Sequence, residues 1–119
     1  MSESPAAPGE AIAYKILTLA QLAQWQAQGE FAGAPVDLAD GFIHLSAANQ
    51  VQGTLDKHFA GQDDLLLVAI DLEALGDAVK WEVSRGGALF PHVYGALPLS
   101  CILTVAPIEA SVRGVDQVR

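Results

Sequence analysis

The sequence predicts an α+β domain in which helices and strands alternate early and strands cluster late. Residues 13–18 (AYKILT) alternate weakly between apolar and polar side chains, which indicates a first strand. Residues 64–71 (DLLLVAID) form a continuous apolar run bounded by aspartates, which is typical of a fully buried strand. More strand-like segments follow in the last third of the chain, and this order favours α+β over a parallel α/β sheet.

The chain has 119 residues, enough for one hydrophobic core but not two. We expect a disordered leader at 1–11, a single domain at 12–111 and a tail at 112–119. No window reaches about eighteen consecutive apolar residues, and the first residues lack a secretory signal pattern. We therefore expect a cytoplasmic protein that does not enter a membrane.

Charge and metal-ligand spacing exclude two classes of function. The 14 acidic and 6 basic side chains give a formal net charge of −8, too acidic for non-specific nucleic-acid binding. The histidines and the single cysteine match no familiar metal-ligand spacing, so we expect no metal site. Cys101 lies in an apolar run predicted as a buried strand, where a core thiol is expected rather than a nucleophile.

A first helix is predicted between Thr18 and Gly29. Thr18 suits the N-cap, and Gly29 suits the stop at the C-terminal end. Leu19, Leu22 and Trp25 recur at three-residue steps, which predicts a stripe facing the core.

The segment GFIHLS carries the first candidate site residue, His44. It follows a predicted loop at 29–41, and Ser46 is predicted to cap a second helix over 47–60. Strand alternation places Phe42 and His44 on one face. A histidine just before a helix N-terminus suits an anion site. The alternative is a structural imidazole bonded to the backbone of the preceding loop.

The segment KWEVSRGG predicts a second group of polar side chains. If it is extended, Lys80, Glu82 and Ser84 share one face, and Arg85 precedes two glycines. A carboxylate beside a hydroxyl and an ammonium can serve as a general base or bind a ribose. The alternative is a solvated strand edge.

The segment FPHVYG predicts an edge or a lid, because Pro91 cannot donate a ladder hydrogen bond. His92 and Tyr94 lie two apart and would face together if extended, which suits a platform for a flat ring. The alternative is a turn held by the packing of Tyr94. His58, near the end of the second predicted helix, is given no role.

Taken together, DGFIHLS, HFAGQDDLLLVAID and KWEVSRGGALFPHVYG resemble a family of small, mostly bacterial proteins, domain of unknown function nine-five-two. The resemblance covers residues 13–108. It implies an ADP-ribosyltransferase-like fold, in which a split antiparallel or mixed sheet with two short helices surrounds a nucleotide cleft, and it implies NAD as the cofactor.

The resemblance also implies roles for individual residues. The FIHLS strand is similar to one in RNA 2′-phosphotransferases, so His44 is expected to bind the adenosine ribose with Ser46 beside it. Arg85 is expected at the pyrophosphate, and Tyr94 with His92 at the ring. Glu82 and His92 are the catalytic candidates for ADP-ribosyl or phosphate transfer.

Two other functions stay open. Glu82 precedes Tyr94, the reverse of the usual order in ADP-ribosyltransferases, which favours a non-catalytic binding or interaction module that kept the cleft. A small hydrolase or isomerase could instead use His44 and His92 as an acid–base pair on another metabolite. In each case the expected partner is a small, nucleotide-like or similar molecule, and the sequence does not predict an oligomeric state.

Overall fold

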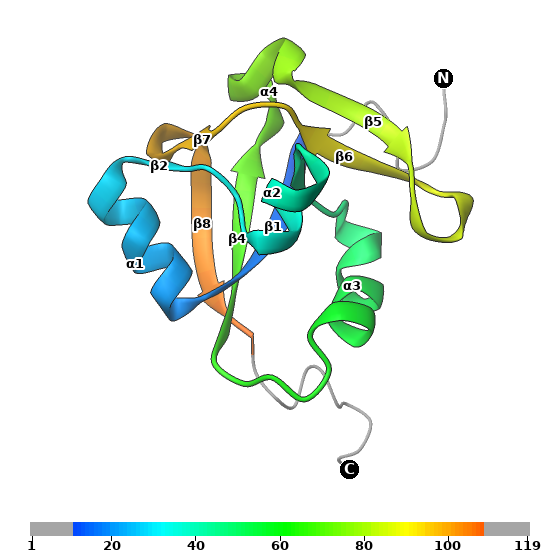
Figure 1. Ribbon diagram of the computed structural model, residues 1–119, viewed down its shortest axis with the longest axis horizontal. Helices are drawn as coiled ribbons and strands as arrows, with labels where there is room; N and C mark the ends of the chain where they lie inside the picture. Colours follow the sequence, from blue (N-terminus) through cyan, green and yellow to red (C-terminus); the bar gives the residue numbers. More distant parts are fainter. Residues whose placement is uncertain (1–10, 109–119) are drawn as a thin grey trace.

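The computed structural model describes residues 11–108, apart from the side chain of Arg85. The fold in this range is α+β (Figure 1). The strands are β1 (Ile12–Thr18), β2 (Glu30–Phe31), β3 (Ile43–His44), β4 (Leu65–Asp71), β5 (Val79–Val83), β6 (Leu89–Val93), β7 (Leu97–Pro98) and β8 (Ile102–Pro107). The helices are α1 (Leu19–Gln28), α2 (Pro35–Asp40), α3 (Val51–His58) and α4 (Leu72–Leu75), joined in places by 3-10 turns.

The strands form three antiparallel sheets, with the orders β1-β4-β8, β3-β6-β5 and β2-β7. The first two are joined at one point, where Tyr14 of β1 and Ser46 exchange backbone hydrogen bonds of 2.8 and 2.9 Å. Beyond this bridge β1 and β3 part, and the two sheets diverge. The central position of β4 confirms the prediction of a buried strand at 64–71.

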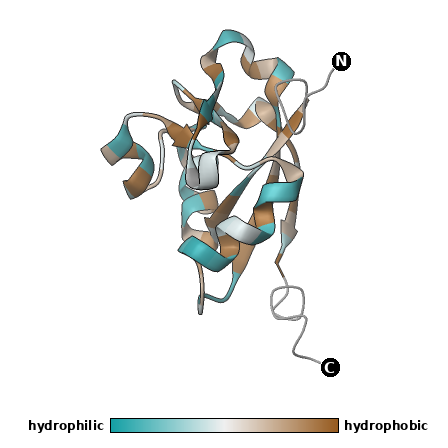
Figure 2. Cartoon of the chain, turned by 90° about the vertical axis from the view of Figure 1, so that its right-hand side faces the viewer, coloured by the Kyte–Doolittle hydropathy of each residue, from teal (hydrophilic) through white to brown (hydrophobic). Residues whose placement is uncertain are grey.

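Two hydrophobic clusters lie on opposite faces of β4. Val68 and Ile70 belong to the larger cluster, which includes Trp25 of α1, whereas Leu65 packs with Leu55 of α3 in the smaller one. This division follows from the alternation of side chains along a strand. Figure 1 shows α1 and α3 on either side of the sheet, and Figure 2, with α3 toward the viewer, shows mostly hydrophobic strands behind a helix of mixed hydropathy.

Helix α1 has the predicted ends. Thr18 Oγ1 accepts from Gln21 N at 3.1 Å and Gln21 Oε1 accepts from Thr18 N at 3.0 Å, which forms a capping box. Gly29 (φ 83°) donates to the carbonyl of Trp25 and ends the helix. The predicted apolar stripe is wrong at Leu19, which is 60% exposed, because three-residue steps drift by about 60° around a helix at each step.

The predicted loop at 29–41 is wrong, because this segment contains β2 and α2. Asp37 explains why so short a helix forms: its Oδ2 accepts from the N–H of Ala34 at 2.7 Å, one of the groups left open at a helix start. The structure therefore has four α-helices in the described residues, not two. The other additional helix, α4, is a single turn of four residues directly after β4.

Ser46 does not cap a helix, contrary to the prediction. Its backbone pairs with Tyr14, its hydroxyl lies 2.9 Å from Thr54 Oγ1, and α3 begins only at Val51. A 3-10 turn at Ala48–Gln50 intervenes. His44 therefore does not stand at the helix N-terminus, and the helix-dipole argument for an anion beside it does not hold.

Pro91 does not lie at an edge or in a lid, contrary to the prediction. It is buried in β6, the middle strand of the sheet β3-β6-β5, and pairs with Trp81 of β5. The carbonyl of Pro91 accepts from Leu45 N at 3.0 Å, so the backbone of residue 91 points toward β3 rather than β5. An N–H at position 91 would face the carbonyl of Leu45, so its absence removes that bond, and β3 ends at His44.

Cys101 is buried, as predicted, but it ends a 3-10 turn before β8 instead of lying within the strand. Burial raises the pKa of its thiol to about 11, which makes it a poor nucleophile at neutral pH. No helix within residues 11–108 is long and apolar enough to cross a membrane. The predicted leader, except for Ala11, and the predicted tail lie outside the described residues.

Candidate functional site

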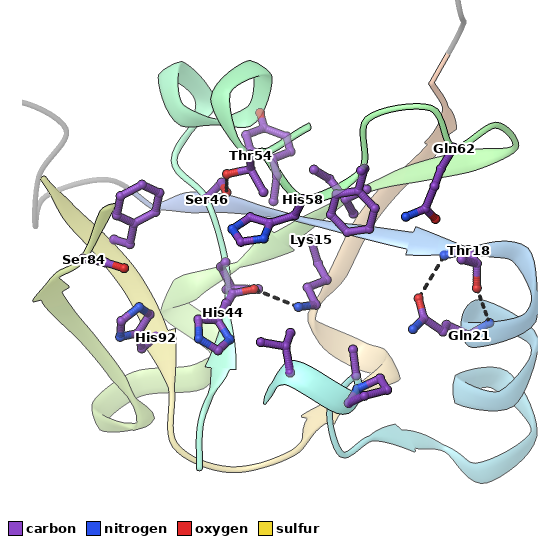
Figure 3. A pocket seen from close by; sticks show the side chains of 18 residues that line it. Lys15, Thr18, Gln21, His44, Ser46, Thr54, His58, Gln62, Ser84 and His92 are labelled. Atoms are coloured by element: carbon purple, nitrogen blue, oxygen red, sulfur yellow. Dashed lines mark hydrogen bonds between the residues drawn. The ribbon is translucent and has the colours of Figure 1, made fainter. Parts of the chain in front are cut away.

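A cavity of about 400 Å³ lies where the two larger sheets part. Residues from β1, β3, β6 and α3 line it, together with Pro35 and Val36 of α2 and Gln21 of α1. Figure 3 shows His44, His92 and Ser84 toward one end of the cavity and Thr18, Gln21 and Gln62 toward the other. His44 and His92 thus lie toward one end of the lining and the amides of Gln21 and Gln62 toward the other, with His58 between them.

All three histidines of the chain line this cavity, although they come from three different elements. His44 is in β3, His58 ends α3 and His92 is in β6. Lys15 also lines it, whereas none of the lining residues among those described is acidic. In a chain of net charge −8, the described lining thus combines three imidazoles and one ammonium.

Asp37 organises the wall of the cavity from behind. Its side chain is 1% exposed and accepts from Lys15 Nζ at 3.2 and 3.0 Å, from His44 N at 3.1 Å and from His44 Nδ1 at 2.7 Å. Lys15 Nζ also donates to the carbonyl of His44 at 3.0 Å. The network ties β1, α2 and β3 together.

The two charges of this network balance one another. Burial by itself would raise the pKa of Asp37, but the charge of Lys15 and the hydrogen bonds from His44 and Ala34 outweigh burial and hold that pKa below its usual value. Burial lowers the pKa of Lys15, against the attraction of Asp37. The Lys15–Asp37 pair is structural, because the charge of each partner offsets the free-energy cost of burying the other.

His44 is held at both ring nitrogens. Nδ1 of His44 lies 2.7 Å from Oδ1 of Asp37. Its Nε2 lies 2.9 Å from Oδ2 of Asp40, which is four residues earlier in the chain and ends α2. Two carboxylate acceptors are matched when each ring nitrogen donates. In this arrangement His44 has no free nitrogen to act as a base, which agrees with the alternative of a structural imidazole.

His92 is held differently. Its Nδ1 lies 2.7 Å from Glu82 Oε1, and Tyr94 donates to both oxygens of Glu82 at 2.8 and 3.1 Å. The hydrogen bonds from His92 and then Tyr94 lower the pKa of Glu82, which keeps this carboxylate ionised. The carboxylate does not line the cavity, so it supports His92 from behind.

The other ring nitrogen of His92, Nε2, differs from the two ring nitrogens of His44, which both have carboxylate partners. Nε2 is buried and has no hydrogen-bond partner among the described residues. Since Nδ1 donates to a carboxylate, the neutral ring carries its lone pair on Nε2. His92 lines the cavity, although Nε2 itself has almost no accessible surface. A buried polar atom without a partner is costly, and a bound ligand can remove that cost.

Aromatic packing fixes the plane of the His92 ring. Phe42 stacks on it at a centroid distance of 4.2 Å and an interplanar angle of 23°. Phe42 also contacts His44 at 4.7 Å and Tyr94 at 5.3 Å. The predicted shared face of Phe42 and His44 is confirmed, and so is the shared face of His92 and Tyr94.

The open edge of β1 adds backbone groups to the cavity. Tyr14 points its N–H and C=O away from β4, toward Ser46, and backbone direction alternates along a strand. Ile16 therefore points its N–H and C=O to the same edge, where no further described strand pairs with β1. Because Ile16 lines the cavity, these groups are available to a ligand.

The structure brings most of the predicted site residues together. His44, Ser46 and His92 line the cavity, and Glu82 and Tyr94 lie behind His92. Arg85 begins a 3-10 turn directly after β5, and its side chain is not among the described parts of the structure.

Sequence reasoning missed Lys15, Asp37, Asp40 and the role of His58. Two signals were present: a lysine in an otherwise apolar strand, AYKILT, and the four-residue spacing of Asp40 and His44. No local pattern marks Asp37 as the partner of Lys15, since 22 positions separate them.

Comparison with known proteins gives the family. The profile of a protein family of unknown function, DUF952, matches residues 16–105. The chain belongs to this family. No protein of curated function matches it. The expected family is thus confirmed, and membership by itself assigns no activity.

Solved structures of one relative are similar to this chain. The crystal structure of protein CC0527 from Caulobacter crescentus has 51% sequence identity and a TM-score of 0.80, with 82% of this chain and 86% of that chain covered. The solution NMR structure of CC0527 has 50% identity and a TM-score of 0.73, covering 84% and 88%. At this identity the α+β fold is shared.

Proposed function

We propose that the cavity binds a small nucleotide-like molecule carrying ribose hydroxyls and phosphates, with NAD and ADP-ribose as the reference ligands. The observation that carries this proposal is the lining of the cavity, where the imidazoles of all three histidines meet the hydroxyls of Ser46, Thr54 and Ser84. A ligand hydroxyl that reaches the buried Nε2 of His92 would satisfy an acceptor that has no described partner.

The composition of the cavity supports the same ligand class. Its volume of about 400 Å³ falls in the range of about 300–1,000 Å³ that small-molecule sites occupy. The hydroxyls of Ser46, Thr54 and Ser84 line it, together with Lys15, whose ammonium is paired with the buried Asp37. Hydroxyls and imidazoles in the lining offer hydrogen bonds to the hydroxyls of a ribose.

The split between the sheets, together with the FIHLS segment, supports an ADP-ribosyltransferase-like ancestry as part of this proposal. His44 then shapes the ribose end of the cavity with Ser46 beside it, and Arg85 is kept as the candidate for the pyrophosphate. A transferase that uses Glu82 directly on the ligand is not favoured, because this carboxylate is engaged by His92 and Tyr94 outside the cavity lining.

Isothermal titration calorimetry with NAD and with ADP-ribose tests the proposal. We expect wild-type protein to bind at least one of them and His92→Phe to bind about tenfold more weakly, the loss expected for one hydrogen bond of about 1.4 kcal/mol. Lys57→Ala, an exposed change beside His58, is the matched control and should bind like wild type. Absence of heat with both ligands, or equal affinity for His92→Phe, contradicts the proposal.

A second candidate is a binding module without catalysis. The observation that favours it is the position of Glu82, whose carboxylate lies outside the cavity lining and is occupied by two hydrogen-bond donors. Incubation of the protein with NAD and chromatography for free nicotinamide separates the candidates. Release of nicotinamide by wild-type protein that His92→Phe abolishes would exclude the non-catalytic module.

A further inference from the structure

We propose that the backbone N–H and C=O of Ile16 bind the flat end of the ligand, a nucleobase or carboxamide edge that presents a hydrogen-bond acceptor next to a donor. The inference deepens the proposed function and rests on it, because it assigns one end of the same cavity to one part of a nucleotide-like molecule. It concerns binding and requires no chemical step.

Strand β1 presents Ile16 to the open edge of its sheet. Tyr14 exchanges two backbone hydrogen bonds with Ser46, at 2.8 and 2.9 Å, on the side away from β4. Backbone direction repeats at every second residue of a strand, so the N–H and C=O of Ile16 point to this same side. Beyond the bridge to Ser46, no described strand pairs with β1 there.

The cavity reaches this edge of β1 and is not confined to one face of the sheet. Tyr14, Lys15 and Ile16 are consecutive residues, and all three line the cavity. Consecutive side chains of a strand point to opposite faces of its sheet. A cavity that meets all three therefore lies along the strand edge, where the backbone groups of Ile16 are directed. Leu45 and Ser46 line the cavity on the other side of the gap.

The two backbone groups of Ile16 are costly to leave unpaired. The residue is only 5% exposed, and neither its N–H nor its C=O has a hydrogen-bond partner among the described residues. Buried backbone groups in proteins are nearly always paired, because an unpaired one loses the hydrogen bonds that it made with water. A ligand that supplies one acceptor and one donor satisfies both groups.

The free edge is one residue long, which favours a small planar group over an added peptide strand. On either side of Ile16 the alternate residues already have partners: Tyr14 pairs with Ser46, and Thr18 N–H donates to Gln21 Oε1 at 3.0 Å. A peptide strand pairs with several alternate residues of an edge. The edge of a nucleobase or a carboxamide pairs with a single residue, because its acceptor and its donor lie side by side.

The rest of the lining suits a ligand with a flat group and a sugar at different ends. Four apolar side chains from outside the three sheets line the cavity: Ala34, Pro35, Val36 and Phe59. Figure 3 shows Thr18, two residues after Ile16 on β1, toward the end of the cavity away from His44 and His92. Apolar walls favour a ring, whereas the imidazoles and hydroxyls offer hydrogen bonds to a ribose.

The first test needs no ligand. Scalar couplings across hydrogen bonds, measured by NMR between amide nitrogens and carbonyl carbons, report which backbone groups are paired. We expect couplings from the N–H groups of Lys15 and Leu17 to carbonyls of β4, and none from the N–H of Ile16. A coupling from Ile16 N–H to any carbonyl or carboxyl carbon of the protein overturns the inference, because the donor would already have a partner.

The second test titrates the full chain with three ligands that share a ribose phosphate. ADP-ribose carries adenine, nicotinamide mononucleotide carries a carboxamide, and ribose 5-phosphate carries neither. We expect the amide proton of Ile16 to shift downfield with at least one of the first two, and the ligand that shifts it identifies the flat group. Ribose 5-phosphate should leave this signal in place.

The outcomes of this titration separate the inference from the proposed function. Imidazole signals that shift at saturation while the amide of Ile16 stays in place overturn the inference and leave the proposed function standing. An equal shift of the Ile16 amide with all three ligands also overturns the inference. Absence of binding of every ligand contradicts the proposed function itself.

A variant that removes only the donor completes the test. Nonsense suppression with the α-hydroxy acid analogue of isoleucine replaces the N–H of residue 16 by an ester oxygen and keeps the side chain. We expect the ligand that shifts the Ile16 amide to bind this ester about tenfold more weakly, the loss for one hydrogen bond. The same replacement at Ile12 is the matched control, because Ile12 is an exposed isoleucine of β1 that lies outside the cavity lining. Equal affinity of the two esters for that ligand overturns the inference.

Discussion

At the scale of single residues, the site depends on carboxylates that orient histidines. Asp37 and Asp40 hold the two nitrogens of His44, and Glu82 holds one nitrogen of His92. The same pair of residue types therefore gives two outcomes. Both ring nitrogens of His44 are held by carboxylates, whereas one nitrogen of His92 is held and the other is buried without a described hydrogen-bond partner.

The first prediction at this scale concerns Asp37→Asn. Breaking a buried ion pair leaves Lys15 without its partner, so we expect a loss of about 3 kcal/mol in the free energy of unfolding at neutral pH. Urea unfolding measures this loss. Asp56→Asn is the control, because Asp56 is exposed and accepts a hydrogen bond from Gln52 on the same helix.

The difference between wild type and Asp37→Asn should also depend on pH. The folded-state pKa of Asp37 lies below its usual value of 3.8, so its contribution is complete above pH 3.8 and is lost as the pH falls through the lower folded-state pKa. We expect the two unfolding free energies to converge in that acid range. A difference that stays constant as far as the folded state persists in acid would show that the charge of Asp37 is not what stabilises the protein.

Local patterns predicted some residues of the site and not others, for a physical reason. Strand alternation was enough to place Phe42 beside His44 and His92 beside Tyr94, because such faces are a property of one segment. The contact between Lys15 and Asp37 joins segments 22 positions apart, and only the path of the whole chain creates it.

At the scale of elements, α2 is the piece that the site requires and that sequence patterns did not predict. It has only six residues, begins at Pro35 and is held by the bond from Ala34 N to Asp37. Residues rich in Gly, Pro and Asp are more common in loops, and here they form a short helix because tertiary contacts of Asp37 stabilise it. Helix α1 was predictable because its cap and stop residues are local.

The prediction at this scale compares Gly33→Ala with Gly41→Ala, on either side of α2. Both glycines have positive φ, at 130° and 91°. A Cβ at position 33 would lie 2.9 Å from Cβ of Asp37, whereas nothing lies within 4 Å of one at position 41. We expect Gly41→Ala to cost about 1–2 kcal/mol in unfolding free energy from backbone strain alone, and Gly33→Ala to cost clearly more.

Urea unfolding and the amide resonance of His44 are the measurements for this pair. Because Gly33→Ala displaces Asp37, its spectrum should show a changed His44 amide, and that of Gly41→Ala should show a smaller change. Equal losses of stability and equal shifts would mean that Asp37 adjusts freely, and α2 would then not determine the geometry of the site.

At the scale of the whole molecule, the parting of two sheets creates the cavity. The bridge between Tyr14 and Ser46 is the point where they join, and beyond it the open edge of β1 faces the histidine-bearing β3 and β6. The α+β class and the central strand were predictable from hydrophobic patterns. The meeting of three histidines, 14 and 34 positions apart in sequence, was not, because it depends on how the sheets are joined.

The most direct test of the account is a titration of the protein with ADP-ribose, followed through the imidazole ¹H–¹⁵N signals of His44, His58 and His92. These residues lie in β3, α3 and β6, and all three line the cavity. We predict that all three signals shift with one dissociation constant, equal to that from calorimetry. Signals that stay in place at saturation, or shifts confined to residues outside the cavity, would contradict the claim that this cavity is a nucleotide site.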